Sequence, residues 1–263
     1  MRNMKFLSFS LFILVLFTGC IETIEAPWNT KVVPVVYSVI TPGYPVQVYV
    51  GKSFLESDST KINPFSSARV FVCGSDSNWI ELKQSTDSTI YTDTNHSIQV
   101  QKGKTYSLRI EMKDLTLRAK TTVPGEPGII SQVECKVNTV RGNGVLNVKY
   151  TLPTNHDLGC YLSTPTDIYR SGLLFGNSIQ EQIYNLPPDS TSFQLDITTT
   201  DSYLKKYIIA ESIYWNQGFV GIQSILLSYG GVSPAFSNIQ NGIGLFGSFT
   251  TESKRVEVTK ITE

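Results

Sequence analysis

Short runs of alternating apolar and polar residues, separated by turn residues, constrain the fold of this chain most strongly. The clearest run covers residues 104–110, where Tyr106, Leu108 and Ile110 alternate after a glycine turn. A period of two is typical of a strand that buries one face. Seven or eight such runs over residues 31–123 predict an immunoglobulin-like β-sandwich.

Residues 124–128, Pro-Gly-Glu-Pro-Gly, predict a linker, because two prolines and two glycines in five residues sustain neither a helix nor a central strand. The linker divides the sandwich from a second, β-rich domain over residues 129–263. Pro34 is expected to place the first strand at a sheet edge or a bulge. The predicted strands cover residues 31–40, 46–50, 68–72, 79–82, 90–91, 97–100, 104–110, 117–123, 129–137, 145–152, 161–162, 168–169, 180–184, 193–197, 204–213, 244–250 and 255–261.

One helix is expected near residues 215–229. Apolar residues recur there at spacings of three and four, from Phe219 to Tyr229, and two glycines follow. Core packing is favoured over a recognition surface for the aromatic residues Tyr214, Trp215 and Phe219. The predicted fold class is therefore all-β with a single amphipathic helix.

The N-terminus has the layout of a secretory signal. Arg2 and Lys5 precede an apolar run over residues 6–17, and Phe17-Thr18-Gly19-Cys20 closes it. This ending resembles a lipobox, which predicts a lipoprotein signal peptide at residues 1–19 and a lipidated Cys20 carrying palmitate or another acyl chain. Residues 20–30 then form the anchor and tether. An uncleaved anchor is the weaker alternative, since spanning a bilayer takes about 20 apolar residues, and an ordinary signal with a coincidental cysteine is the other.

Composition excludes several classes of function. The full chain has 22 basic and 22 acidic residues, and removal of the signal takes away two basic ones, which leaves a net charge of −2. Nucleic-acid binding calls for a basic face, so none is expected. Two histidines leave little material for a metal site or a catalytic triad.

Three cysteines remain in the mature chain besides Cys20. An odd number leaves at least one of Cys73, Cys135 and Cys160 free. A disulfide between Cys135 and Cys160 is one interpretation, and unpaired thiols in the core are the favoured one.

No motif in the sequence carries clear chemistry. Residues 242–247 match the Gly-x-Gly-x-x-Gly pattern, but no strand–helix unit surrounds them, so packing glycines are favoured over a dinucleotide site and no cofactor is expected. His96 and His156 lie in polar turns and are expected at the surface. Oxygen-bearing residues at 76–78 and 93–95 do not continue as a calcium loop, and no metal site is expected.

A tripeptide, Asp-Ser-Thr, occurs three times in polar stretches. It resembles the acceptor sequence for O-glycosylation of exported proteins in Bacteroidota, which makes Ser59, Ser88 and Ser190 candidate modification sites. The alternative is that these residue types populate loops in any protein.

Near the C-terminus, Ser-Asn-Ile-Gln-Asn-Gly-Ile-Gly-Leu-Phe-Gly at residues 237–247 resembles the DUF4249 family of Bacteroidota outer-membrane lipoproteins. The residues that carry the motif are Ser237, Asn238, Ile239, Asn241, Gly242, Gly244, Phe246 and Gly247. The lipobox, the valine-rich first strand, Gly103-Lys104-Thr105-Tyr106 and Ala119-Lys120-Thr121-Thr122-Val123-Pro124 agree in order. Residues 155–200 contain no motif of this kind.

The resemblance implies a non-enzymatic accessory protein at the outer membrane, anchored through Cys20 on the periplasmic or the surface-exposed face. Its expected partner is a TonB-dependent transporter or an extracellular ligand. A structural or adhesive envelope protein is the alternative, and a hydrolase with a scattered active site is a third hypothesis. An exposed aromatic patch would favour binding, whereas a pocket holding His156 and Asp157 would favour the enzyme.

Overall fold

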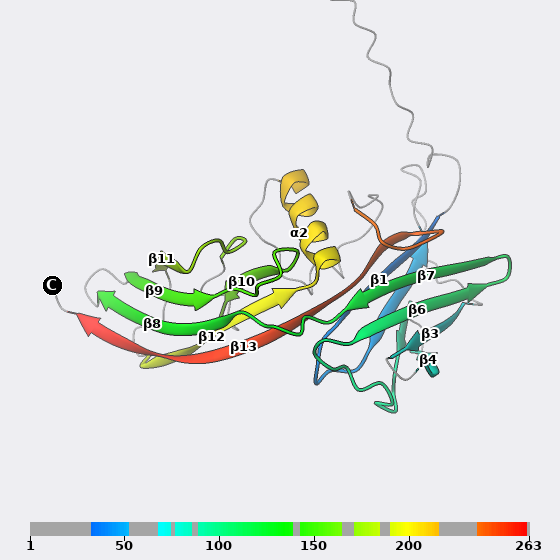
Figure 1. The fold of residues 1–263 in the computed structure, drawn as a ribbon, viewed down its shortest axis with the longest axis horizontal. Helices are drawn as coiled ribbons and strands as arrows, with labels where there is room; N and C mark the ends of the chain where they lie inside the picture. Colours follow the sequence, from blue (N-terminus) through cyan, green and yellow to red (C-terminus); the bar gives the residue numbers. More distant parts are fainter. Residues whose placement is uncertain are drawn as a thin grey trace, which may run out of the picture. The chain divides into compact units, whose positions relative to one another are not determined.

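In the part of the chain that it describes, the computed structural model consists almost entirely of strands, with one helix (Figure 1). It describes residues 33–52, 68–74, 77–85, 89–138, 143–164, 171–184, 190–215 and 236–261. The predicted fold class, mainly β with one helix, is confirmed.

The first sandwich consists of two antiparallel sheets around one core. One sheet has the order β1-β2-β5 and the other has the order β4-β3-β6-β7, and a short pairing between β5 and the end of β4 connects the two. Alternation places Val70, Leu108 and Ile110 in the core, each at most 2% exposed. The strands are β1 (Pro34–Ile40), β2 (Gln47–Lys52), β3 (Arg69–Cys73), β4 (Trp79–Gln84), β5 (Ile90–Thr92), β6 (Thr105–Met112) and β7 (Leu115–Thr122).

This pairing is that of an immunoglobulin-like fold, in which the first, second and fifth strands share one sheet and the third, sixth and seventh share the other. A second feature agrees with it. Tyr106, near the start of β6, donates its hydroxyl hydrogen to Gln99 O at 2.9 Å and accepts from Gln101 N at 2.8 Å. Such a tyrosine corner, bonded to backbone just upstream, is a hallmark of these sandwiches.

The second sandwich repeats the pattern of strand pairing. Its sheets are β11-β9-β8 and β10-β12-β13, and its core contains Leu146, Leu162 and Leu195. The strands are β8 (Ile129–Asn138), β9 (Asn143–Thr151), β10 (Gly159–Ser163), β11 (Ser178–Tyr184), β12 (Ser192–Thr200) and β13 (Ile243–Ile261). The predicted linker at residues 124–128 lies between β7 and β8, and the domain limits stay a prediction.

The last strand, β13, is shared by both sandwiches. Residues 243–248 run parallel to β1, residues 249–257 pair with β12, and residues 258–261 run parallel to β8 (Figure 1). The prediction of two separate closing strands was wrong. The polar residues around Ser253 break the apolar alternation, yet this part of β13 is held by hydrogen bonds to β12 rather than by burial.

The predicted strand at residues 204–213 is also wrong, because these residues belong to α2 (Ser202–Trp215). Asp201 starts the helix as its N-cap, accepting from Leu204 N at 2.7 Å. Leu204, Tyr207 and Ile208 form a buried helical face against a cluster that includes Tyr37 and Leu245. Tertiary packing on this face overrides the β-propensity of Tyr207 and Ile208. The helix expected at residues 215–229 lies outside the described residues apart from Trp215, which ends α2.

Two local expectations in the first sandwich need correction. Pro34 is the first residue of β1, where its missing N–H breaks no ladder, and β1 is central between β13 and β2 rather than an edge. Residues 97–100 are irregular instead of a strand. There Ile98 N donates to Asp93 Oδ2 at 2.7 Å, so a side chain satisfies the backbone.

The three described cysteines are buried and none forms a disulfide, which confirms the interpretation as core thiols. Burial raises the pKa of Cys135 to about 11 and also raises that of Cys160. Both groups are therefore protonated at neutral pH and pack as small apolar residues.

Candidate functional site

The segment at residues 237–247 that carries the family motif, called the motif loop below, closes onto the beginning of β13. The side chain of Asn238 bonds both backbone groups of Phe246: Phe246 N donates to Oδ1 at 2.9 Å, and Nδ2 donates to Phe246 O at 2.8 Å. Asn238 N also donates to Gly244 O at 3.3 Å. The Asn238 side chain thus makes the two hydrogen bonds to the backbone of Phe246 that a neighbouring strand would otherwise make.

Further hydrogen bonds fix the two ends of the motif loop. Ser237 Oγ accepts from Ile239 N at 3.2 Å and from Gly244 N at 3.1 Å. Asn241, which has a positive φ of 64°, donates from Nδ2 to Thr116 O at 3.0 Å on β7. The loop therefore ties β13 to the first sandwich.

Close packing against neighbouring residues explains why glycine, which has no side chain, occupies positions 244 and 247 of the motif loop. Gly244 has a φ of +124°, and a Cβ there would lie 1.8 Å from Val36 O on β1. At Gly247 a Cβ would lie 3.0 Å from Leu204 Cβ on α2. Ile239 and Phe246 are buried in the core of the first sandwich. The motif residues hold the fold together, and none of these contacts offers a ligand site.

A buried polar cluster around Asp201, called the Asp201 cluster below, links the start of α2 to β7 and β13. Asp201 is 3% exposed, and its Oδ2 accepts from Ser248 Oγ at 3.1 Å and from the hydroxyl of Thr121. Thr121 lies on β7, whereas Ser248 lies on β13. Burial raises the pKa of Asp201, and the hydrogen bonds from Thr121, Leu204 and Ser248 oppose that rise. Protein groups fill this cluster, so its role is structural.

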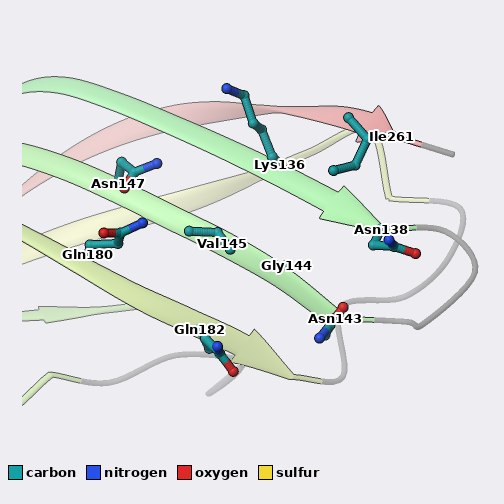
Figure 2. A pocket seen from close by; sticks show the side chains of 9 residues that line it. All are labelled: Lys136, Asn138, Asn143, Gly144, Val145, Asn147, Gln180, Gln182 and Ile261. Atoms are coloured by element: carbon teal, nitrogen blue, oxygen red, sulfur yellow. The ribbon is translucent and has the colours of Figure 1, made fainter. Parts of the chain in front are cut away.

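A hollow of about 400 Å³ lies on the outer face of the second sandwich, where β8, β9, β11 and β13 meet (Figure 2). We call it the amide hollow, because five of its nine lining residues are Asn or Gln. Figure 2 shows Asn147 and Gln180 side by side on neighbouring strands, as their register requires. The lining residues are Lys136, Asn138, Asn143, Gly144, Val145, Asn147, Gln180, Gln182 and Ile261.

The outer face of the first sandwich carries a different arrangement, a ladder of stacked cations and rings. The Arg109 guanidinium lies 4.5 Å from the Trp79 ring centroid and 4.7 Å from that of Phe71, and Arg69 lies 4.9 Å from Phe71. Arg69 also bonds Glu81 through two contacts of 2.9 Å. Both guanidinium groups thus lie against aromatic rings, and Arg69 also pairs with Glu81.

The candidate site residues named in the sequence analysis do not lie together in one place. His96 and His156 are exposed, as predicted, and neither lines the amide hollow. Ser190 is half-buried just before β12. Cys20, Ser59 and Ser88 lie outside the described residues, so lipidation and O-glycosylation stay predictions.

Among the residues that the structure describes, no group of three His, Cys, Asp or Glu side chains is placed to hold a metal ion. In the same part of the chain, no helix is both long and apolar enough to cross a membrane. Sequence reasoning missed the amide hollow, because its residues come from three separate segments, 136–147, 180–182 and Ile261, and form no local motif.

Strand pairing and the two cores define a protein of two successive β-sandwiches joined by a shared C-terminal strand. The chain belongs to the family described as "Domain of unknown function (DUF4249)", whose model matches residues 21–255. No curated protein matches it.

Solved structures give only distant likenesses. One is a segment of two fibronectin type-III domains from chicken tenascin, at 14% identity and a TM-score of 0.23, covering 65% of this chain and 91% of that one. Another is a solved chain from work on a 1.5-MDa bacterial ice-binding adhesin, at 10% identity and a TM-score of 0.23, and the match covers 88% of this chain and 65% of that solved chain. TM-scores this low carry no conclusion about function.

Proposed function

We propose that this protein is a non-enzymatic lipoprotein of the outer membrane, anchored through Cys20. The apolar run that ends in Gly19-Cys20 supports the anchor. Several acyl chains, each gaining about 0.8 kcal/mol per buried methylene, hold a protein at a bilayer without a spanning helix.

We further propose that it acts as an accessory binding subunit beside a TonB-dependent transporter. The observation that carries a binding role is the amide hollow, a concave site on the described surface that five side-chain amides line together with apolar residues. The chain enters the described region at Val33, and Val35 pairs with Ile243 at the start of β13. The hollow includes Ile261 at the other end of that strand. A strand of 19 residues spans up to about 60 Å, at roughly 3.3 Å per residue, so the hollow and the pairing with Val35 lie at opposite ends of β13.

Lipidation is tested first, by metabolic labelling with a fatty acid that carries an alkyne group. Label is expected in wild type and absent in Cys20→Ala. Cys73→Ser serves as the matched control, because it removes a buried thiol and keeps a donor to Gly74 O, which lies 3.3 Å from Sγ. Equal labelling of wild type and Cys20→Ala would contradict the anchor.

The partner is tested by crosslinked capture from the native envelope with the same three proteins. We expect wild type and Cys73→Ser to recover a β-barrel transporter in stoichiometric amount, and Cys20→Ala to lose it. Recovery of nothing above background would refute the accessory role and would favour the structural or adhesive alternative.

A further inference from the structure

We propose that the amide hollow binds a neutral, hydroxyl-rich ligand, an oligosaccharide, through side-chain amides of β9 and β11. This inference rests on the proposed function as a binding protein. Asn147 on β9 and Gln180 on β11 are paired in register, so their amide groups lie on the same face of the sheet. A primary amide offers two donors and an acceptor together. A hydroxyl group is likewise both donor and acceptor, so each amide matches a sugar hydroxyl in either direction.

The backbone of the floor is not free to bind a ligand. β9 pairs with β8 along one edge and with β11 along the other, from Asn143 to Lys149. Its N–H and C=O groups are therefore engaged in the two ladders. An extended peptide that lay over β8 and β9 would find no strand edge there, and a ligand in this part of the hollow must be recognised by side chains above the sheet.

Charge in the hollow favours a neutral ligand. Lys136 is the single charged residue of the lining, and its Nζ lies 3.0 Å from Glu134 Oε1 on the same strand. A phosphate or nucleic-acid site calls for several cations or for backbone N–H groups aimed at the anion. Here the one cation already has a carboxylate partner.

The apolar part of the hollow suits the carbon face of a sugar ring. Val145 lies between Lys136 and Gln182 in register, and Ile261 closes the side toward β13 with 38% of its surface exposed. Binding sites combine apolar lining with a few polar groups that fix orientation. Val145 and Ile261 supply the apolar lining, and the five side-chain amides supply the polar groups. The volume of about 400 Å³ lies in the range of small-ligand sites.

The test is a titration of the full mature chain followed by NMR of the side-chain NH₂ groups of Asn and Gln. The probes are cellohexaose, maltohexaose, mannohexaose and chitohexaose as neutral sugars, a hexamer of galacturonic acid as an anionic sugar, and a neutral capped octapeptide of Ser, Thr, Asn and Gly. We expect at least one neutral sugar to shift the resonances of Asn147 and Gln180. The double variant Asn147→Ala/Gln180→Ala should weaken its binding about tenfold or more, because each lost hydrogen bond lowers affinity several-fold. Gln132→Ala, an exposed site on β8 outside the lining, should leave Kd within about twofold.

Three outcomes overturn the inference. Binding of a sugar that the double variant does not weaken places its site elsewhere. Shifts caused by the octapeptide or by the anionic sugar alone assign the hollow to another ligand class. The absence of shifts at these amides with every neutral sugar at 20 mM removes the assignment. If the transporter is still captured in any of these cases, the proposed function stands without this ligand.

Discussion

The motif loop and the amide hollow are opposite kinds of region. The motif loop is specific in sequence and partly buried, and Asn238, Gly244 and Phe246 bond or touch neighbouring strands. The amide hollow has no sequence signature, and its polar side chains line open space. The comparison shows that the segment carrying the family motif has a structural role, because its residues must pack closely against neighbouring elements. The surface that we propose to bind a ligand is free of that constraint.

The largest effect on stability is expected at Gly244. Alanine there would place its Cβ 1.8 Å from Val36 O at a φ of +124°, so Gly244→Ala should lower the free energy of unfolding by more than about 4 kcal/mol or prevent folding. Gly172→Ala is the control, since a Cβ there meets nothing within 4 Å, and its change should stay within about 0.5 kcal/mol. Urea unfolding measures both. Equal stability of the two variants would refute the structural role of the motif glycine.

The next largest effect is expected in the Asp201 cluster. Asp201→Ala removes the N-cap of α2 and leaves the hydroxyls of Thr121 and Ser248 without their shared acceptor. We expect a loss of about 2–3 kcal/mol in the free energy of unfolding. Asp201→Asn keeps an acceptor for Leu204 N and should lose less. If Asp201→Asn at pH 4 lost as much free energy of unfolding as Asp201→Ala, the capping role would be contradicted.

The same residue predicts a pH dependence. The pKa of Asp201 is raised in the folded protein by burial, so the folded state holds the proton more tightly than the unfolded state. The resulting stability is present at low pH and is lost as pH rises through the folded-state pKa. Wild type should therefore lose stability relative to Asp201→Asn from about pH 4 upward. Urea unfolding from pH 3.5 to 7 checks this, and a difference that does not change with pH would contradict it.

A smaller loss is expected from Asn238→Ala. The two hydrogen bonds to the backbone of Phe246 disappear, which should cost about 1–3 kcal/mol in the free energy of unfolding. Asn95→Ala, at an exposed turn, is the matched control and should change stability by less than about 0.5 kcal/mol. A neutral result at Asn238 would mean that the motif loop is not held by its side-chain amide.

The smallest effect on stability is expected in the amide hollow. Asn147 is half-buried and Gln180 is exposed, so Asn147→Ala/Gln180→Ala should change the free energy of unfolding by less than about 1 kcal/mol. A loss above about 2 kcal/mol would show that these amides serve the fold.

Sequence patterns predicted most strands, because segments that bury one face, such as residues 105–112, alternate between apolar and polar residues. They failed where tertiary packing decides the outcome. Leu204, Tyr207 and Ile208 form a helical face, yet a run of β-branched and aromatic residues favoured a strand. The exposed middle of β13 has no alternation of apolar and polar residues, because backbone pairing with β12 stabilises it instead of burial. The amide hollow was not predictable, since only sheet register brings Asn147 and Gln180 together.

The most direct test of the division between a structural motif loop and a binding hollow is urea unfolding of two variants side by side. Asn238→Ala is predicted to be less stable than wild type by about 1–3 kcal/mol, whereas Asn147→Ala/Gln180→Ala is predicted to unfold close to wild type. The reverse order, with a stable Asn238→Ala and a destabilised hollow variant, would contradict the division between the two regions.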